Sequence, residues 1–198
     1  MPTISPMAIR GVWRDGYVLD YHTVSSTCIG YNEFGHPVFD TQYTPLGELL
    51  FRLKSRSDAS VVDEIVEMVA GFVEVIWKPA VTMIVPVPPS NTARRWQPVF
   101  LLADALGKRL RLAVHRDAVT KNRKTPQLKN VYDYAERART LDGAFSAKPS
   151  VIEGEKVLLF DDLFRSGATM GGVTKALIAA GRASEVHALA LTRTRRRS

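Results

Sequence analysis

The sequence predicts an α/β domain whose mainly parallel, twisted sheet is flanked by helices, with a small β-rich appendage at its N-terminal side. Two largely apolar runs, residues 81–88 and 156–161, have the composition of strands buried on both faces, which is typical of a parallel sheet. Each run is followed by a polar loop and then by a segment of helical composition. This alternation of strand, loop and helix favours the α/β class.

The totals suit one domain with an appendage, because 198 residues are enough to bury a proper core. The formal net charge of +7 favours anionic partners such as polyphosphates or nucleic acid. Cys28 is the single cysteine, which excludes an intrachain disulfide and a multi-cysteine zinc site and suits a reducing cytosol. With neither a secretory signal pattern nor an apolar run of membrane-spanning length, the sequence predicts a cytoplasmic protein.

Residues 1–44 form the predicted β-rich appendage, since they are rich in glycine, proline, aromatic and β-branched residues. We expect two short strands over residues 11–21, with a turn at 14–16, and a further hairpin near residues 32–35. The aromatic side chains of this segment either fill a small core or stack on a planar base. His22 is isolated in the sequence and is predicted to be neither a metal ligand nor a catalyst.

Helical spacing of the apolar residues begins at residue 45. Pro45 starts a first helix, and Ser57 or Asp58 caps a second that runs to about Trp77. Both helices are expected to cover the sheet. Lys54 lies in the region between them, where it is either solvated or faces a ligand.

The strand over residues 81–88 ends in prolines, which cannot extend a central ladder. The loop after it is polar and basic, and an amphipathic helix follows. Arginine pairs with pyrophosphate oxygens through bidentate, charge-assisted hydrogen bonds. The loop is therefore either a diphosphate site, with Arg94 and Arg95 as its candidate contacts, or a solvated basic loop.

A second basic stretch, residues 116–138, follows a short strand and has no clear period. A polar loop of this length in a compact domain is usually a functional lid or a disordered segment. A lid that closes over a substrate excludes water and places cations beside a leaving group. Lys121 and Arg123 are its candidate catalytic residues.

Asp161 and Asp162 stand where the strand over residues 156–161 is expected to end. A turn and the start of a helix follow, with the residues Arg165, Ser166, Gly167, Ala168 and Thr169. Ligands of open α/β sheets bind beyond the carboxyl ends of the strands, where a helix N-terminus offers unpaired N–H groups and a positive dipole end. The turn can hold an anion while the two acids face hydroxyls or a metal, which suits a sugar phosphate. The alternative is an ordinary strand–turn–helix in which an aspartate is the N-cap.

These residues resemble the ribose-phosphate signature of type I phosphoribosyltransferases, in which an apolar strand, two acids and a Thr/Ser-Gly-x-Thr loop follow one another. The resemblance implies that Asp161 and Asp162 contact the ribose 2′- and 3′-hydroxyls. It also implies that residues 165–169 wrap the 5-phosphate of phosphoribosyl pyrophosphate (PRPP). Arg165 departs from the family pattern, which usually has a small residue there.

The strand end Val85-Pro86-Val87-Pro88 and its basic loop are similar to the ComF-like (competence protein F) branch of that family. Three further stretches fit the branch, namely 125–127, 136–137 and 143–145, so the resemblance covers about residues 80–192. It implies that residues 88–96 hold the diphosphate of PRPP, with Pro89, Ser90, Asn91, Arg94 and Arg95 as the contacts. The four-cysteine zinc module that often precedes the family domain has no counterpart here, since Cys28 stands alone.

The implied activity is transfer of the phosphoribosyl group from PRPP to a nitrogen acceptor, such as a nucleobase, with release of pyrophosphate. Mg²⁺ is the implied cofactor, held by Asp161, Asp162 and substrate oxygens. The alternative is a non-catalytic PRPP sensor, or a nucleic-acid-associated protein linked to DNA uptake. The basic tail over residues 193–198 either contacts nucleic acid or is solvated, and a homodimer is expected.

Overall fold

The computed structural model describes residues 3–89, 96–122, 141 and 143–195. The predicted diphosphate contacts Ser90, Asn91, Arg94 and Arg95 lie outside the described residues, and so does the predicted lid residue Arg123. The motifs predicted at 125–127 and 136–137 and the tail residues 196–198 also lie outside them.

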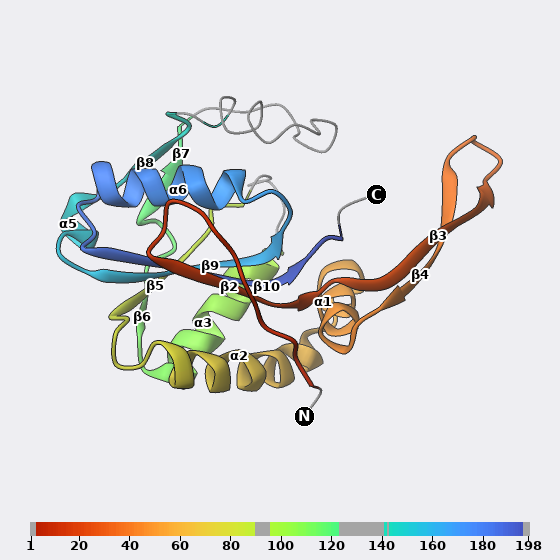
Figure 1. Ribbon diagram of the computed structural model, residues 1–198, viewed down its shortest axis with the longest axis horizontal. Coiled ribbons are helices and arrows are strands. Elements are labelled where there is room, and N and C mark those ends of the chain that lie inside the picture. Colours follow the sequence, from red (N-terminus) through yellow and green to blue (C-terminus); the bar gives the residue numbers. More distant parts are fainter. Residues whose placement is uncertain (1–2, 90–95, 123–140, 142, 196–198) are drawn as a thin grey trace.

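A six-stranded sheet forms the centre of the molecule (Figure 1). Its strand order is β1-β2-β10-β9-β5-β6, and each neighbouring pair is parallel except β1 with β2. The predicted α/β fold with a mainly parallel sheet is confirmed. The strands are β1 (Met7–Ala8), β2 (Asp15–Tyr21), β5 (Met83–Pro86), β6 (Ala113–Val114), β9 (Lys156–Phe164) and β10 (Glu185–Arg193).

Helices cover both faces of this sheet, as Figure 1 shows. Val157 and Leu159 of β9 pack toward α6, whereas Leu158 and Phe160 pack toward α1, α2 and α3. The alternation follows from the two-residue period of a strand, and it explains why the run 157–160 is apolar throughout. The helices are α1 (Pro45–Ser55), α2 (Val62–Ile76), α3 (Pro98–Leu110), α5 (Pro149–Ile152) and α6 (Ala168–Ala179), with a 3₁₀ turn at Ala59–Val61.

The N-terminal segment divides differently from the predicted appendage over residues 1–44. Strand β2 lies inside the central sheet, parallel to β10, with Tyr17 opposite Leu189. Its residues Val18 and Leu19 are fully buried, one on each face, so this strand is an integral part of the core. Residues 15–16 are the first residues of β2 instead of part of the predicted turn; the chain bends earlier, over residues 11–14, between β1 and β2.

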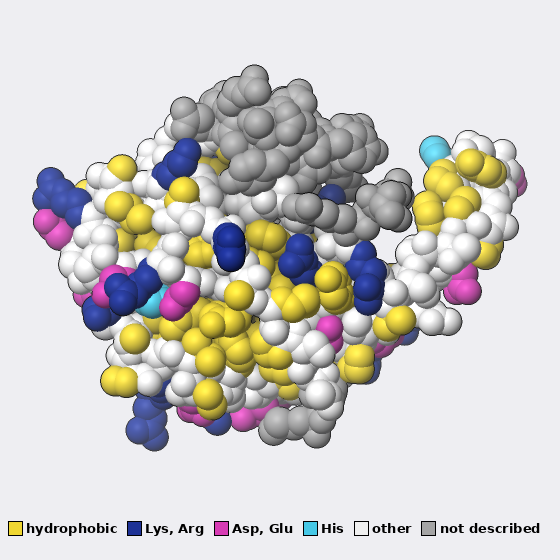
Figure 2. All heavy atoms as spheres, viewed as in Figure 1, with side chains coloured by type: hydrophobic (Ala, Val, Ile, Leu, Met, Phe, Trp, Pro, Cys, Tyr) yellow, Lys and Arg dark blue, Asp and Glu magenta, His cyan; other side chains and the backbone are white. Residues whose placement is uncertain are grey.

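Strands β3 (Thr23–Tyr31) and β4 (Pro37–Tyr43) form the one part of this segment that stands away from the sheet (Figure 1). The predicted turn near residues 32–35 joins them. There the Asn32 side chain accepts hydrogen bonds from the backbone N–H groups of Phe34 and His36. Figure 2 shows hydrophobic side chains exposed on this hairpin, and its exposed large residues are Val24, Ile29, Tyr31, Phe34, Val38 and Phe39.

A small antiparallel sheet of β7 (Val119–Lys121) and β8 (Phe145–Ala147) lies beside α6. Among the described residues, no helix combines the length and the apolar character needed to cross a bilayer. The cytoplasmic location stays a prediction.

Helix α1 is anchored to the end of β2. Thr44 is its N-cap, and the Thr44 hydroxyl accepts a hydrogen bond from the Gly47 N–H (3.0 Å) and donates one to the Tyr21 carbonyl (2.6 Å). Gly47 itself packs directly on the His22 carbonyl, and a Cβ there would overlap that oxygen. The start of α1 therefore has a fixed position relative to the sheet.

We expect Gly47→Ala to lower the free energy of unfolding by about 1–3 kcal/mol, because the added methyl must displace backbone at a buried position. Gly71→Ala in α2 is the matched control. A Cβ at Gly71 meets no atom within 4 Å, so the higher helix propensity of alanine should stabilise the protein by up to about 1 kcal/mol. Urea unfolding of the two variants measures both signs, and equal effects would contradict the close packing of α1 on His22.

Candidate functional site

The candidate site lies where the strands of the central sheet end at different points. The ladder of β5 with β9 ends at the pair Pro86 and Phe160, followed by a hydrogen bond from the Val87 N–H to the Phe160 carbonyl (2.8 Å). Strand β9 continues to Phe164 beside β10. The sequence predicted that the strand would end at the two acids. Instead, Asp161 and Asp162 lie within β9, because β10 keeps pairing with it beyond the end of β5.

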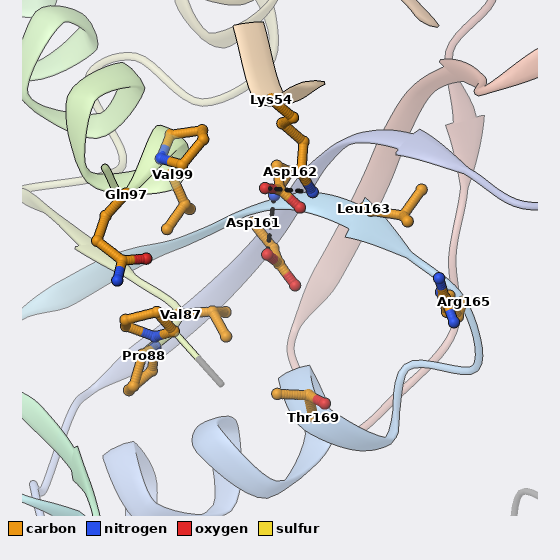
Figure 3. A pocket seen from close by; sticks show the side chains of 12 residues that line it. Lys54, Val87, Pro88, Gln97, Val99, Asp161, Asp162, Leu163, Arg165 and Thr169 are labelled. Atoms are coloured by element: carbon orange, nitrogen blue, oxygen red, sulfur yellow. Dashed lines mark hydrogen bonds and ion pairs between the residues drawn. The ribbon is translucent and has the colours of Figure 1, made fainter. Parts of the chain in front are cut away.

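A cavity of about 310 Å³ opens at this edge (Figure 3). Its walls come from the end of α1, the loop after β5, the start of α3, the end of β9 and the start of α6. A small-molecule site of this size fits the lower end of the usual range. The lining residues are Lys54, Val87, Pro88, Pro89, Gln97, Pro98, Val99, Asp161, Asp162, Leu163, Arg165 and Thr169.

Asp162 is directed toward α1, where Lys54 meets it (Figure 3). The Lys54 ammonium lies 2.9 Å from the Asp162 carboxylate, and the two side chains are 29% and 16% exposed. An ion pair this sheltered from solvent is screened less than a surface pair. The sequence left open whether Lys54 is solvated or faces a ligand, and the structure places it in the lining of the cavity.

Asp161 is directed to the opposite side, toward the cavity and Thr169 (Figure 3). Its carboxyl accepts a hydrogen bond from the Asp162 N–H (2.8 Å). Burial, with the nearby charge of Asp162, raises the pKa of Asp161 to about 8, against the opposing effects of backbone hydrogen bonds and Lys54. The raised pKa favours the neutral form of the Asp161 carboxyl, which can donate a hydrogen bond, beside the ion-paired Asp162.

The turn after β9 brings an anion-binding helix end to the same cavity. Gly167 is the N-cap of α6 with φ 78°, and a Cβ there would lie 2.9 Å from the Phe164 ring, so the position requires glycine. Glycine has no side chain that could cap the helix, and the first backbone N–H groups of an α-helix have no acceptor within the helix. Arg165 and Thr169 flank this end and line the cavity. The arrangement suits a phosphate group.

The structure brings together five of the predicted residues in the lining of the cavity: Pro89, Asp161, Asp162, Arg165 and Thr169. Ser166, Gly167 and Ala168 form the turn and the helix start beside them. Lys121 is not brought to the cavity, because it ends β7 and pairs with Phe145 of β8. It is half-buried there, and burial lowers the pKa of its ammonium. Its predicted catalytic role has no support from this position.

His22 lies close to the site, although the sequence reading gave it no role. Burial and the charges of Lys54 and Arg165 lower the pKa of His22, against the opposing charge of Asp162. Its Nδ1 lies 3.2 Å from the Thr192 hydroxyl, which donates to the Asp162 carbonyl (3.4 Å). Only the pairing of β2 with β10 reveals this proximity, because the sequence contains no signal for it.

The predicted basic tail begins in packed structure. Arg193 is the last residue of β10, and its guanidinium lies 5.8 Å from the Tyr21 ring centre. Arg195 lies 4.2 Å from the same ring and donates a hydrogen bond to the Thr23 carbonyl (3.0 Å). These two arginines therefore belong to the folded body.

The residues that line the cavity do not form a Mg²⁺ site. The Asp162 carboxylate is already paired with the Lys54 ammonium, and the raised pKa of Asp161 disfavours the charged carboxylate form that Mg²⁺ prefers as a ligand. Across the described parts of the chain, no group of three or more His, Cys, Asp or Glu side chains is placed to hold a metal ion. Mg²⁺ stays a prediction.

No family model matches the chain. The chain is similar to the competence protein ComFC of Bacillus subtilis (strain 168), with 23% identity over 195 residues. The match covers 96% of this chain and 75% of ComFC. The predicted ComF-like resemblance is confirmed, and the similarity extends beyond residues 80–192, on which the motifs lie.

Solved structures similar to the chain include several phosphoribosyltransferases. Adenine phosphoribosyltransferase from Leishmania tarentolae shows 11% identity and a TM-score of 0.49, with 96% of this chain and 94% of that chain covered. The Trypanosoma brucei enzyme, solved with AMP, pyrophosphate and ribose-5-phosphate, shows 12% identity and a TM-score of 0.48, with 94% and 73% covered. Glutamine PRPP amidotransferase from B. subtilis shows 17% identity and a TM-score of 0.48, with 80% and 34% covered.

We expect Asp161→Asn to remove a pH dependence of stability. Because the pKa of Asp161 is raised to about 8 in the folded protein, the folded state keeps a proton that the unfolded state releases above about pH 4. Stability therefore falls as the pH rises from about 4 through 8. Asparagine cannot ionise, so at about pH 9 the variant should be more stable than the wild type, by on the order of 1 kcal/mol or more.

Urea unfolding at several pH values between about 5 and 9 measures this difference. Asp117→Asn is the control, because the hydrogen bond from Lys148 lowers the pKa of that exposed carboxyl. Its stabilising effect is complete above about pH 4 and constant over the measured range. A wild-type slope in Asp161→Asn would show that Asp161 is ionised throughout.

Proposed function

We propose that this protein binds PRPP and transfers its phosphoribosyl group to a nitrogen acceptor, with release of pyrophosphate. The observation that carries the proposal is the meeting of a helix N-terminus with two adjacent carboxyls in one cavity. Asp161, Asp162 and Thr169 line that cavity at the carboxyl end of β9. A phosphate on the turn and a sugar against the acids would satisfy both features.

In this proposal the 5-phosphate binds the amides of the turn over residues 165–169, with the Thr169 hydroxyl and the Arg165 guanidinium as further donors. The ribose hydroxyls face Asp161 and Asp162. A neutral Asp161 would donate a hydrogen bond to a hydroxyl oxygen, whereas Asp162 would accept one. Pro89, the first of the predicted diphosphate contacts, lines the cavity, and Arg94 and Arg95 remain proposed diphosphate contacts.

The reaction breaks the bond between ribose C1 and the diphosphate oxygen and forms a bond from C1 to the acceptor nitrogen. The acceptor nitrogen loses a proton, and the diphosphate leaves with the electron pair of the broken bond. Positive charge develops on the sugar and negative charge on the leaving group, so positioning and fixed charges supply most of the catalysis. No step of this proposal depends on a metal ion, and a base for the proton is not assigned.

A second candidate is a protein that binds PRPP without turnover, or that associates with nucleic acid. The similarity to the competence protein ComFC and the net charge of +7 favour it. Pyrophosphate release with a panel of nucleobases and amines would support the transferase. A failure of every acceptor, together with DNA binding that weakens steeply with salt, would support the second candidate. A homodimer and the cytoplasm remain predictions under either candidate.

We expect Thr169→Val to weaken PRPP binding about tenfold, because the variant loses a hydroxyl donor to a charged phosphate. Isothermal titration calorimetry with PRPP measures the loss. Thr174→Val is the matched control on the same helix. Thr174 is fully buried, and its hydroxyl has no hydrogen-bond partner among the described residues, so valine should leave both folding and binding intact. Equal PRPP affinity in the two variants would contradict the proposed phosphate site.

A further inference from the structure

A lysine in the cavity already neutralises the carboxylate that the family resemblance assigns to sugar and metal. The Lys54 ammonium lies 2.9 Å from Asp162, and both residues line the cavity with Asp161 (Figure 3). Each of the two side chains is less than one-third exposed to solvent. A divalent cation approaching Asp162 would have to displace this ammonium and overcome its repulsion.

The fold holds Lys54 in this place. Lys54 is in the last turn of α1, and the start of that helix is fixed by the hydrogen bonds of Thr44 and by the packing of Gly47 on His22. The adjacent residue Leu53 is fully buried in the core between the helices and the sheet. The ammonium thus comes from a rigid element and not from a loop.

Among the described residues, the charges around Asp162 come from four parts of the fold. Strand β9 supplies Asp161 and Asp162, α1 supplies Lys54, the end of β2 leads to His22, and the turn before α6 supplies Arg165. The Lys54 ammonium pairs with the Asp162 carboxylate at 2.9 Å, and by formal charge Lys54 and Arg165 balance the two carboxyls of the lining. The described side chains therefore leave no surplus of negative charge to attract a divalent ion.

We infer that Lys54 is the resident cation of this site: it holds Asp162 in the position where a divalent metal would otherwise bind, so that the cavity receives a phosphorylated sugar without a protein-bound metal ion. Lys54 is a positioning residue in this inference. Its ammonium also faces the cavity, where it adds a positive charge on the side opposite the helix end that would bind a phosphate.

Mn²⁺ binding to the full-length protein tests this inference without any substrate. We expect Lys54→Met to bind Mn²⁺ at least about tenfold more tightly than the wild type, as measured by electron paramagnetic resonance of free Mn²⁺, because removal of the ammonium leaves adjacent carboxyls uncompensated. The double variant Lys54→Met/Asp162→Asn should lose this gain. Lys54→Arg keeps the charge and should bind Mn²⁺ as weakly as the wild type.

Lys156→Met is the matched control, because it removes a lysine that pairs with Glu185 (3.4 Å) at the other end of the same strand. Its Mn²⁺ affinity should not change. Wild-type Mn²⁺ affinity in a folded Lys54→Met would overturn the inference, and would leave Lys54 as a structural ion pair that affects only the melting temperature. Tight Mn²⁺ binding by the wild type at Asp162 would overturn it as well.

A second arm rests on the proposed function and uses PRPP itself. The PRPP diphosphate itself binds Mg²⁺, so the decisive quantity is the difference between variants. Calorimetry in EDTA and in Mg²⁺ should show a gain in affinity from Mg²⁺ that is at least about tenfold larger for Lys54→Met than for the wild type. An equal gain in the two proteins would overturn the inference. If the wild type binds no PRPP in either buffer, the proposed function fails, while the Mn²⁺ arm still decides the role of Lys54.

Discussion

The unequal length of neighbouring strands is the constraint on which the candidate site depends. Prolines end β5 at Pro86, because they cannot donate to a ladder, while β9 and β10 remain paired as far as Phe164 and Arg193. The last residues of β9 are therefore held rigidly from one side and open on the other. No described strand pairs with β9 on that open side beyond Phe160, so Asp161 and Asp162 line a cavity there.

The long ladder of β9 with β10 is in turn supported by β2 on the far side of β10. Parallel strands are stable when both faces and both edges are covered, and β2 covers an edge of β10 along most of its length. This pairing carries His22 to Thr192 and so to the backbone of Asp162. Strand β2, which the sequence assigned to an appendage, thus supports the strand beside the site and the backbone of Asp162.

Periodicity and turn chemistry were sufficient to predict the parts of the fold that depend on local sequence. The run 157–160 is apolar because both faces are buried, and Pro45 begins α1 as its position predicts. The pairing of β2 with β10 joins the two ends of the chain, and no local pattern encodes it. For the same reason the sequence identified the acids and the turn, but left Lys54 open and missed the position of His22.

The hairpin of β3 and β4 begins directly after His22 and ends directly before Thr44. Both ends are tied down, since the His22 N–H donates to the Arg193 carbonyl and the Thr44 hydroxyl to the Tyr21 carbonyl. The exposed arm is thus mechanically continuous with the helix that delivers Lys54. The arm and α1 therefore share one attachment to the sheet at Thr44, with the exposed apolar side chains of the arm before it in the chain and Lys54 after it.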